Sequence, residues 1–302
     1  MLTLGLDTSN YTTSIAYFDG ETGVNCSQLL PVQPGQLGLR QSDAVFSHTK
    51  SLPELSGRLF SHVRLCDVAA IAVSTRPRAV EGSYMPCFMV GYSHAKMLSD
   101  GLHVPLIHVS HQQGHVAACL WSAGRLDLMD RPHLAWHLSG GTTELLLVEP
   151  DGKNVKCTRI GGTTDISAGQ LIDRTGVMLE LPFPAGKHMD ALAGECKDLF
   201  KVKCPELEFS LSGVQNKVQQ YHQNHTQEET AAYCLNSVCF AVKKATENAL
   251  ARYPGLEVVL SGGVASNSRL RQVMEPLGAV FGAPQYSTDN AMGVAILADR
   301  LK

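Results

Sequence analysis

One pattern constrains the fold of this chain more than any other: a short β-meander followed by helical segments, and it occurs twice. The first meander consists of an apolar strand at residues 2–7, a returning strand at 13–18 and a third candidate near Asn25–Leu30. The second comprises LAWHLSGG, TTELLLVEP and NVKCTRIGG between residues 134 and 162, with Asp151-Gly152 as a hairpin signal. We expect two similar α/β units with a ligand between them.

Helices and further strands follow each meander. In the first half, apolar spacing predicts a helix over 48–65, a buried strand at 68–74 and a second helix over 88–98 that ends before PLIHVS. In the second half, helical patterns at about 210–222 and 228–252 precede the strand LEVVLSGG. A helix from Ser266, a strand at GAVFGA and a last helix after Asp289 complete the series.

Length and charge limit the classes of protein that fit. The chain has 302 residues, of which 44% are hydrophobic, so two domains with separate cores are expected. The formal net charge is −3, and neither half of the chain is strongly basic. A protein that relies on nonspecific phosphate contacts usually carries more positive charge, so an RNA partner would need a local patch or a second subunit.

Cysteine usage and the amino terminus indicate the compartment. Nine cysteines are scattered without a C-x-x-C pair, which favours reduced thiols over a disulfide framework. The first residues turn polar too early for the apolar core of a signal peptide, and no segment reaches the length of a membrane helix. We therefore expect a cytoplasmic protein that does not associate with a membrane.

A pair of histidines points to a metal. His111 and His115 in SHQQGH are four residues apart, so on a helix their imidazoles lie on one face. Together with a carboxylate they form a two-His, one-carboxylate set, which leaves coordination positions open and suits Fe or Zn. The bare H-x-x-x-H spacing also fits a pair that merely packs or caps a helix.

Glycine-rich turns point to a nucleotide. LSGG occurs at 138–141 and again at 260–263, and in duplicated units such turns lie where free backbone N–H groups hold phosphate oxygens. Glycine is favoured there because the backbone must approach the ligand closely. Asp7-Thr8-Ser9 and Ser139–Thr143 occupy the equivalent hairpin turns.

Several ordered motifs match one family at once. The chain resembles the TsaD/Gcp family, the synthases of tRNA threonylcarbamoyladenosine formerly labelled O-sialoglycoprotein endopeptidases. The motifs that carry this resemblance run nearly end to end: GLDTSNYTTSIA, PLIHVSHQQGH, HLSGGTTELLLV, DISAGQLIDRTGVMLELPFPAG, FSLSGVQNKV, SGGVASNSRLR and STDNAMGVAILA.

The resemblance implies an architecture. The family belongs to the superfamily of actin, sugar kinases and the large heat-shock chaperones, so the implied fold is α/β with two duplicated RNase H-like domains and a ligand cleft between them. Residues 1–110, completed by the C-terminal helix at 289–302, form the N-terminal domain. Residues 111–288 form the C-terminal domain, which includes the crossover helix with the two histidines and a helical insertion at about 185–250.

The resemblance also assigns roles to residues. His111, His115 and Asp289 become the metal ligands and act in catalysis through the metal, with Asp7 as a further catalytic residue. Asp173, with its carboxylate, is a natural acceptor for ribose hydroxyls. The positions expected to contact the nucleotide are His137, Leu138, Ser139, Gly140, Gly141, Asp173, Gly186, Asp190, Gly262, Gly263 and Asn267.

The implied reaction moves a threonylcarbamoyl group from its adenylate to the exocyclic amine of the tRNA adenosine beside the anticodon. The implied cofactors are one divalent metal, Fe or Zn, and an adenine nucleotide such as ATP, AMP or threonylcarbamoyl-AMP. The implied partners are tRNA and a smaller homologous subunit. The metal would act as a Lewis acid and template.

The chain departs from the family pattern at several places, which marks it as a divergent paralogue. Asn10-Tyr11-Thr12 replaces a Cys followed by acidic residues, and the usual segment after Gln28 is not recognisable. In H-x-E-G-H the glutamate is replaced by Gln113. A Thr-x-Gly-Pro-Gly loop becomes the SerThrArgProArg of residues 74–78, the loop histidine becomes Thr142, and a PGGP turn becomes residues 184–187.

Two other functions stay open beside the tRNA reaction. One is a non-catalytic scaffold that binds a nucleotide within a modification complex, which the lost acidic residues favour. The other is a carbamoyltransferase with a small-molecule acceptor, for which Arg76 and Arg78 offer anion-binding groups. A metallopeptidase is disfavoured because zinc peptidases of the H-E-x-x-H type need a glutamate beside the first histidine, where this chain has Gln112.

Overall fold

The computed structural model describes residues 1–9, 11–31 and 39–302. Asn10, in the first turn, and residues 32–38, in the stretch after Gln28, lie outside the described residues. Both belong to segments where the sequence departs from the family pattern.

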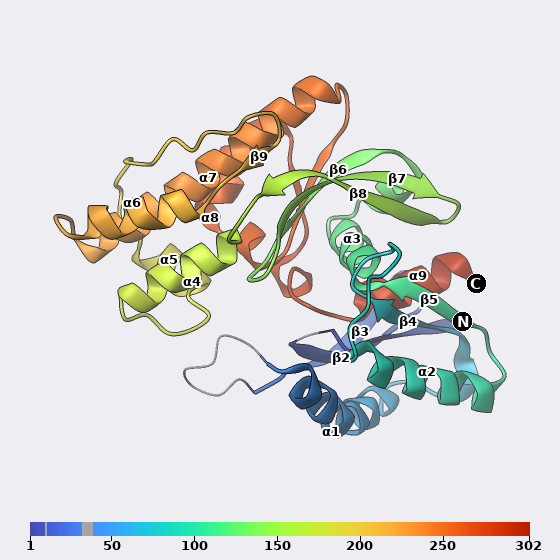
Figure 1. Cartoon of the computed structure of the whole chain (residues 1–302). Helices are drawn as coiled ribbons and strands as arrows, with labels where there is room; N and C mark the ends of the chain where they lie inside the picture. The colour runs from blue at the N-terminus through green and yellow to red at the C-terminus, as the bar shows by residue number, and fades with distance from the viewer. Residues whose placement is uncertain (10, 32–38) are drawn as a thin grey trace. The chain divides into compact units, whose positions relative to one another are not determined.

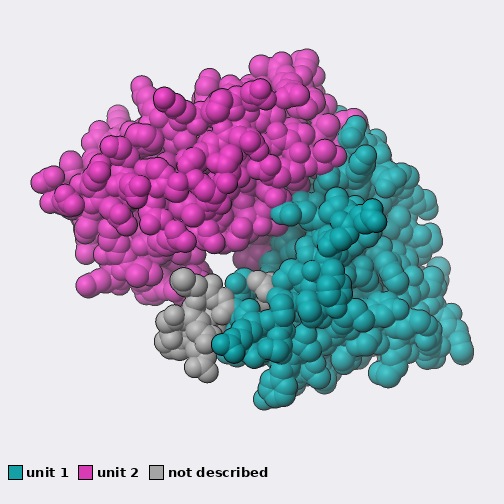
Figure 2. Space-filling view, viewed as in Figure 1, with its two compact units in different colours: residues 1–131, 149–157, 289–302 teal, residues 132–148, 158–288 magenta. Residues whose placement is uncertain are grey.

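The chain forms two compact units, coloured separately in Figure 2. Unit 1 comprises residues 1–131, 149–157 and 289–302, and unit 2 comprises residues 132–148 and 158–288. The division expected from the family resemblance stays a prediction; these units differ from it at residues 111–131 and 149–157, which it placed in the second domain. For residues 111–131 the reason is packing, because the helix that carries the two histidines lies against the C-terminal helix of unit 1.

Unit 1 contains a five-stranded mixed sheet (Figure 1). Its strand order is β3-β2-β1-β4-β5, with β3 at Gly23–Leu29, β2 at Thr12–Phe18, β1 at Leu2–Asp7, β4 at Val68–Arg76 and β5 at Leu106–Ser110. β1, β2 and β3 pair antiparallel, as predicted for the first meander, while β4 and β5 run parallel to β1.

Side-chain alternation along β1 separates two layers of helices. Leu4 and Leu6 point into an apolar cluster with residues of α1 (Gln41–Phe60), and α2 (Phe88–Leu102) packs on β4. The intervening Gly5 faces α9 (Met292–Leu301), and a Cβ there would lie 2.3 Å from the backbone nitrogen of Ala295. Glycine therefore lets α9 lie directly on the sheet, beside α3 (His111–Ser122).

Unit 2 contains most of a six-stranded sheet in the order β11-β10-β6-β7-β8-β9, of which residues 149–157 belong to unit 1. The strands are β11 at Val280–Phe281, β10 at Val258–Ser261, β6 at His133–Leu138, β7 at Thr143–Asp151, β8 at Asn154–Thr163 and β9 at Glu208–Phe209. The helices are α4 at Ala168–Met178, α5 at Gly186–Leu192, α6 at Ser212–His222, α7 at Gln227–Arg252 and α8 at Ser268–Met274. Trp136 of β6 is fully buried, and its indole donates to Thr246 of α7 at 2.8 Å.

Several predicted elements have different bounds, among them the helix predicted over 88–98, which ends at Leu102. The helix predicted over 48–65 spans Gln41–Phe60, because the buried Val63 continues the apolar spacing beyond the helix end and the polar first turn hides its start. The helix predicted from Ser266 begins at Ser268, after a 3₁₀ turn at Gly263–Ser266. The predicted strand GAVFGA is reduced to two residues, and the sequence patterns did not reveal α5 or β9.

Two expectations about the whole chain concern membranes and thiols. Among the described residues, no helix combines the length and apolar character that crossing a membrane requires. All nine cysteines are free thiols, as their scattered spacing predicted.

Candidate functional site

The helix α3 begins with a capping box that fixes its first turn. The hydroxyl of Ser110 accepts from the backbone N–H of Gln113, and the Gln113 side chain accepts from the backbone N–H of Ser110 at 2.9 Å. The amide nitrogen of Gln113 also donates to the carbonyl of Val155 at 2.7 Å. A carboxylate would not make this last bond, which gives the departure from the family's H-x-E-G-H a structural reason.

Two glycines bring the third candidate ligand to α3. At Gly293, in the first turn of α9, a Cβ would lie 1.8 Å from the carbonyl oxygen of Gly114. The two helices therefore meet backbone to backbone between His111 and His115. Asp289, three residues before the start of α9, is thereby held beside the histidine pair. Asn25 of β3 supports this turn by accepting from the backbone N–H of Ala291 at 2.9 Å.

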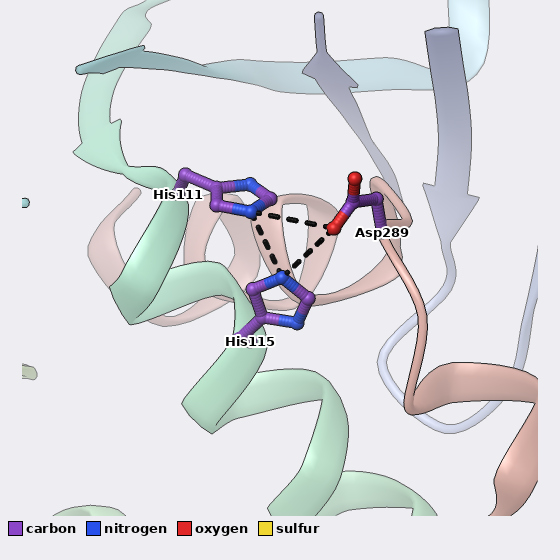
Figure 3. A group of neighbouring side chains, drawn as sticks. All are labelled: His111, His115 and Asp289. Carbon is purple, nitrogen blue, oxygen red and sulfur yellow. Dashed lines mark hydrogen bonds and ion pairs between the residues drawn. The ribbon is translucent and has the colours of Figure 1, made fainter. Parts of the chain in front are cut away.

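The three predicted metal ligands converge on one point (Figure 3). The Nε2 atoms of His111 and His115 are 2.9 Å apart, and they lie 3.6 Å and 3.3 Å from the Oδ1 atom of Asp289. Both imidazoles project from the same side of α3 toward the carboxylate. The i, i+4 spacing thus produces the geometry expected from the sequence, and the group is the one set of potential metal ligands found among the described residues.

Asp7 contacts this group through His111. Its Oδ2 atom lies 2.8 Å from Nδ1 of His111 and accepts from the hydroxyl of Ser74 at 2.6 Å, while Oδ1 accepts from the backbone N–H of Ser9 at 2.9 Å. Its side chain is only 1% exposed. Burial alone would raise the pKa of Asp7, but His111 and the hydrogen bonds from Ser74 and Ser9 outweigh it and lower the pKa.

The electrostatics of the group favour a bound positive charge. Burial disfavours the charged form of His111, yet Asp7 and Asp289 raise the pKa of this imidazole to about 10. Burial opposes ionisation of Asp289 as well, but His111 and His115 hold the pKa of its carboxyl well below the usual range. Two ionised carboxylates thus flank the imidazole pair and stabilise a positive charge there, either that of protonated His111 or that of a bound cation.

The donor atoms fit a divalent metal in type and spacing. Ligand atoms bound to one Zn²⁺ at ~2.0–2.2 Å in tetrahedral geometry lie roughly 3.3–3.6 Å apart. The three distances among the Nε2 and Oδ1 atoms, 2.9, 3.3 and 3.6 Å, lie close to this range. Three protein ligands leave a further coordination position for substrate.

In unit 2, two predicted glycine loops meet at one edge of the sheet. β6 and β10 are adjacent and parallel, so the loops after Leu138 and Ser261 leave the sheet side by side. Gly262 has a φ of +93°, and a Cβ there would lie 2.2 Å from the carbonyl oxygen of Leu138. His137, the first predicted residue of this group, lies on β6 and pairs with Ser261.

The amino terminus of α4 closes on the first of these loops. Ser167 donates to the carbonyl of Gly140 at 2.6 Å, and a Cβ at Gly169 would lie 2.5 Å from the carbonyl oxygen of Ser139. At Gly140, Gly141 and Gly263 an added Cβ meets nothing within 4 Å. A glycine loop next to a helix amino terminus is the arrangement that holds phosphate oxygens.

Asp173 contacts the segment that contains Gly186. Asp173 is one helical turn after Gly169 on α4, on the same face, and its Oδ1 atom accepts from the backbone N–H of Ala185 at 2.8 Å. Burial raises the pKa of this carboxyl. Its second oxygen has no hydrogen-bond partner in the described part of the chain and is available to a ligand.

Asp190 and Asn267 bond to each other. The amide nitrogen of Asn267 donates to Asp190 at 2.9 Å, and its oxygen accepts from the backbone N–H of Leu270, which caps α8. Ser268 donates to Asp190 through both its backbone N–H and its hydroxyl. These partners give both residues a structural role, and their predicted contacts with the nucleotide stay predictions.

The sequence patterns did not reveal three residues that support these groups: Ser74, which holds Asp7, Asn25, which holds the turn after Asp289, and Ser167, which holds the Gly140 loop. Each acts on a residue far away in sequence, at separations of 67, 266 and 27 residues. Ser167 alone had a local signal, because it begins a capping box with Gln170.

Comparison with solved structures defines the class of protein. The fold is that of the actin-like ATPases and sugar kinases. Full-length HypF, in a phosphate- and nucleotide-bound form, aligns with a TM-score of 0.64 and 15% identity over 99% of this chain and 46% of its own. A ROK family glucokinase from Streptomyces griseus, in complex with glucose and AMPPNP, aligns with a TM-score of 0.54 and 10% identity over 99% of this chain and 100% of its own.

Sequence comparison identifies the family within that class. Residues 36–296 match the TsaD family, described as tRNA N6-adenosine threonylcarbamoyltransferase, and the chain belongs to this family. A protein of that name from Sulfurihydrogenibium sp. is 33% identical over 98% of this chain and 89% of its own length. One from Carboxydothermus hydrogenoformans is 34% identical over 76% of this chain and 69% of its own length. The family is one of transferases, so the chain is an enzyme of that type.

Proposed function

We propose that this protein transfers a threonylcarbamoyl group from its adenylate to the exocyclic amine of a tRNA adenosine beside the anticodon. The observation that carries the proposal is the convergence of His111, His115 and Asp289 in a chain of the TsaD family. The proposed setting is the cytoplasm, and a smaller homologous subunit is the proposed protein partner.

We propose that His111, His115 and Asp289 hold a divalent metal, Fe or Zn, through Nε2, Nε2 and Oδ1. When bound, such an ion supplies Lewis-acid stabilisation of negative charge on a phosphate or carbonyl oxygen. The histidines and the aspartate themselves determine where that charge is stabilised, because they fix the position of the ion and leave part of its coordination sphere open.

The loops of unit 2 are the proposed site for the adenylate. Backbone N–H groups of Gly140 and Gly141 at the amino terminus of α4 suit phosphate oxygens, and the available oxygen of Asp173 suits a ribose hydroxyl. In the reaction the amine nitrogen forms a bond to the carbamoyl carbon, the bond from that carbon to the phosphate oxygen breaks, and AMP leaves with the electron pair. The amine releases one proton.

A transfer assay on matched variants tests the proposal. We would measure threonylcarbamoyl transfer to tRNA and metal content for the wild type, His115→Ala and Asp289→Ala. Loss of one of the three ligands should lower both the transfer activity and the metal content by at least about 100-fold, because the remaining two donors bind a metal weakly. His62→Ala is the control, since His62 is an exposed residue in the turn after α1. Activity that persists in both ligand variants would contradict the metal's role.

Nucleotide binding separates this enzyme from a scaffold. Calorimetry with AMP, ATP and a non-hydrolysable threonylcarbamoyl-adenylate analogue should show metal-dependent binding of the analogue that is tighter than binding of AMP. A protein that binds only ATP or ADP, regardless of metal, would favour the non-catalytic alternative.

One observation favours a second acceptor class. Arg76 pairs with Ser110 at the end of the β4–β5 ladder, and Ser110 directly precedes His111 in the chain. The guanidinium of Arg76 is exposed and has no ion-pair partner among the described residues. A small anionic acceptor would use such a group. Arg76→Ala should then raise KM for that acceptor about tenfold with little change in kcat, whereas Arg58→Ala on α1 should change neither. An unchanged KM would leave tRNA as the acceptor to pursue.

A further inference from the structure

The carboxylate of Asp7 is saturated by protein groups. It is wholly buried at the end of β1, and its two oxygens already meet three partners: the backbone N–H of Ser9, the hydroxyl of Ser74 and Nδ1 of His111. A carboxylate in this position has no surface to offer a substrate. Its one contact with the candidate metal centre is through the imidazole of His111.

That contact determines which nitrogen of His111 carries the proton. An imidazole that binds a metal is neutral, with one N–H and one lone pair, and an acceptor at Nδ1 places the proton there. The lone pair is then at Nε2, the atom that faces His115 and Asp289. Carboxylates that hold the far nitrogen of a metal-binding histidine fix both its tautomer and its ring orientation.

Ser74 in turn fixes Asp7. Ser74 is fully buried on β4, the parallel neighbour of β1, and the Leu6–Val73 pair places Asp7 and Ser74 next to each other across the sheet. The 2.6 Å bond from the Ser74 hydroxyl engages the same oxygen that meets His111. The carboxylate therefore has little freedom to rotate away from the imidazole.

We propose that Ser74, Asp7 and His111 form an orienting chain for the metal centre, in which Asp7 is a positioning residue and not a group that touches substrate. Asp7 holds His111 with Nε2 toward His115 and Asp289, and Ser74 holds Asp7. This inference rests on the metal centre of the proposed function and assigns to Asp7 a role different from the catalytic one that the family resemblance implies.

Metal affinity, measured apart from catalysis, tests the chain. The full-length protein and its Asp7→Asn and Ser74→Ala variants would be titrated with Zn²⁺ against a chromophoric chelator, and the visible spectrum would be recorded after Co²⁺ loading. Asp7→Asn should weaken metal binding by about 10–100-fold and change the Co²⁺ spectrum, because an amide holds the imidazole less firmly than a carboxylate. Ser74→Ala should weaken binding by a smaller factor, below about tenfold.

Two controls keep the outcomes apart. Ser99→Ala removes another buried hydroxyl bond of unit 1, to the carbonyl of Val104 at 2.6 Å, and should leave affinity and spectrum unchanged. A folded Asp7→Asn protein with wild-type affinity and spectrum would overturn the orienting chain and leave the metal centre intact. Wild-type protein that binds metal no better than His115→Ala would overturn the metal centre itself.

Discussion

At the scale of single residues, Gln113 shows how a side chain beside the candidate metal ligands can differ from the family pattern. The difference concerns the hydrogen bonds of this side chain and not the ligands themselves. Gln113 stands where the family has a glutamate, yet the Nε2 atoms of His111 and His115 lie 2.9 Å apart beside it. Its amide accepts from Ser110 and donates to Val155 at once, so it ties α3 to the β7–β8 hairpin. The replacement of the family's glutamate by Gln113 therefore changes the hydrogen bonds beside the site.

The substitution Gln113→Glu tests whether the amide of Gln113 has this structural role. A carboxylate would face the carbonyl oxygen of Val155 without a proton to donate, in a side chain that is 7% exposed. We expect a loss of about 1–3 kcal/mol in the free energy of unfolding, measured by urea denaturation at neutral pH. Gln220→Glu, on the exposed face of α6, should change stability by less than about 0.5 kcal/mol. A Gln113→Glu protein as stable as the wild type would refute the structural role of the amide.

At the scale of elements, the crossing of α3 and α9 builds the candidate metal centre. Each helix contributes a glycine at the crossing, and the ligands lie on either side of it. In unit 2, hydrogen bonds to Asp165 fix the amino terminus of α6. Asp165 accepts from the hydroxyls of Ser210 and Ser212 and from the backbone N–H groups of Leu211 and Ser212.

Gly293→Ala should separate the helices. Because its Cβ would lie 1.8 Å from a backbone oxygen of Gly114, one helix must shift, and overpacking of this kind costs about 1–3 kcal/mol or more. Thermal unfolding and Zn²⁺ titration should show lower stability together with weaker metal binding. Gly57→Ala in α1, where a Cβ meets nothing within 4 Å, should not destabilise the protein. Unchanged metal affinity in Gly293→Ala would show that the crossing does not position Asp289.

Asp165→Asn should destabilise the protein in a pH-dependent way. Burial alone would raise the pKa of Asp165, but the bonds from Ser210, Ser212 and Leu211 lower it from 3.8 to about 2. The stabilisation by the ionised form is therefore present above about pH 4 and is lost as the pH falls toward 2. Because the side chain is exposed, we expect a difference of only about 1 kcal/mol at pH 7.

Denaturant unfolding at several pH values would measure this difference. The gap between wild type and Asp165→Asn should be widest near pH 7 and should narrow steadily below pH 4. Glu54→Gln, an exposed change on α1, provides the comparison for general acid effects. A gap that widens as the pH falls would have the opposite sign and would exclude the proposed cause.

At the scale of the whole molecule, the two ends of the chain build one unit. Unit 1 combines residues 1–131 with 289–302, so its last helix follows unit 2 in the sequence. α9 is buried along most of its length, including Met292, Val294, Ile296 and Leu297. Thr3 of β1 donates to the carbonyl of Ala295, which joins the first strand to the last helix.

A chain that ends at residue 288 should therefore lose unit 1. Exposing four large apolar side chains at about 1.5–3 kcal/mol each removes as much free energy as a whole domain usually has to spare. Circular dichroism and urea denaturation should show partial unfolding, whereas loss of metal binding would follow from the removal of Asp289 alone. Arg300→Ala, which removes the bonds to the carbonyl of Lys153 and to Asp130 at the end of the same helix, should keep the native fold and metal binding. A truncated chain with native stability would show that α9 is dispensable.

The sequence by itself determined the local features. Strand alternation gave both meanders, the i, i+4 spacing placed His111 and His115 on one face, and the SHQQ and DISAGQ segments carried capping signals that the structure contains. These features depend on neighbours within a few residues, so a local pattern suffices to predict them. The family resemblance supplied Asp289 as the third member of the group.

Only the tertiary structure decided how distant segments combine. Asp7 meets His111 across 104 residues, Ser74 meets Asp7 across 67, and Gln113 uses its amide on Val155. The same holds for the assignment of α3 to unit 1 and for the mutual bonding of Asp190 and Asn267. No local periodicity encodes such contacts, because they arise when packed helices and strands bring together buried polar groups that must find hydrogen-bond partners.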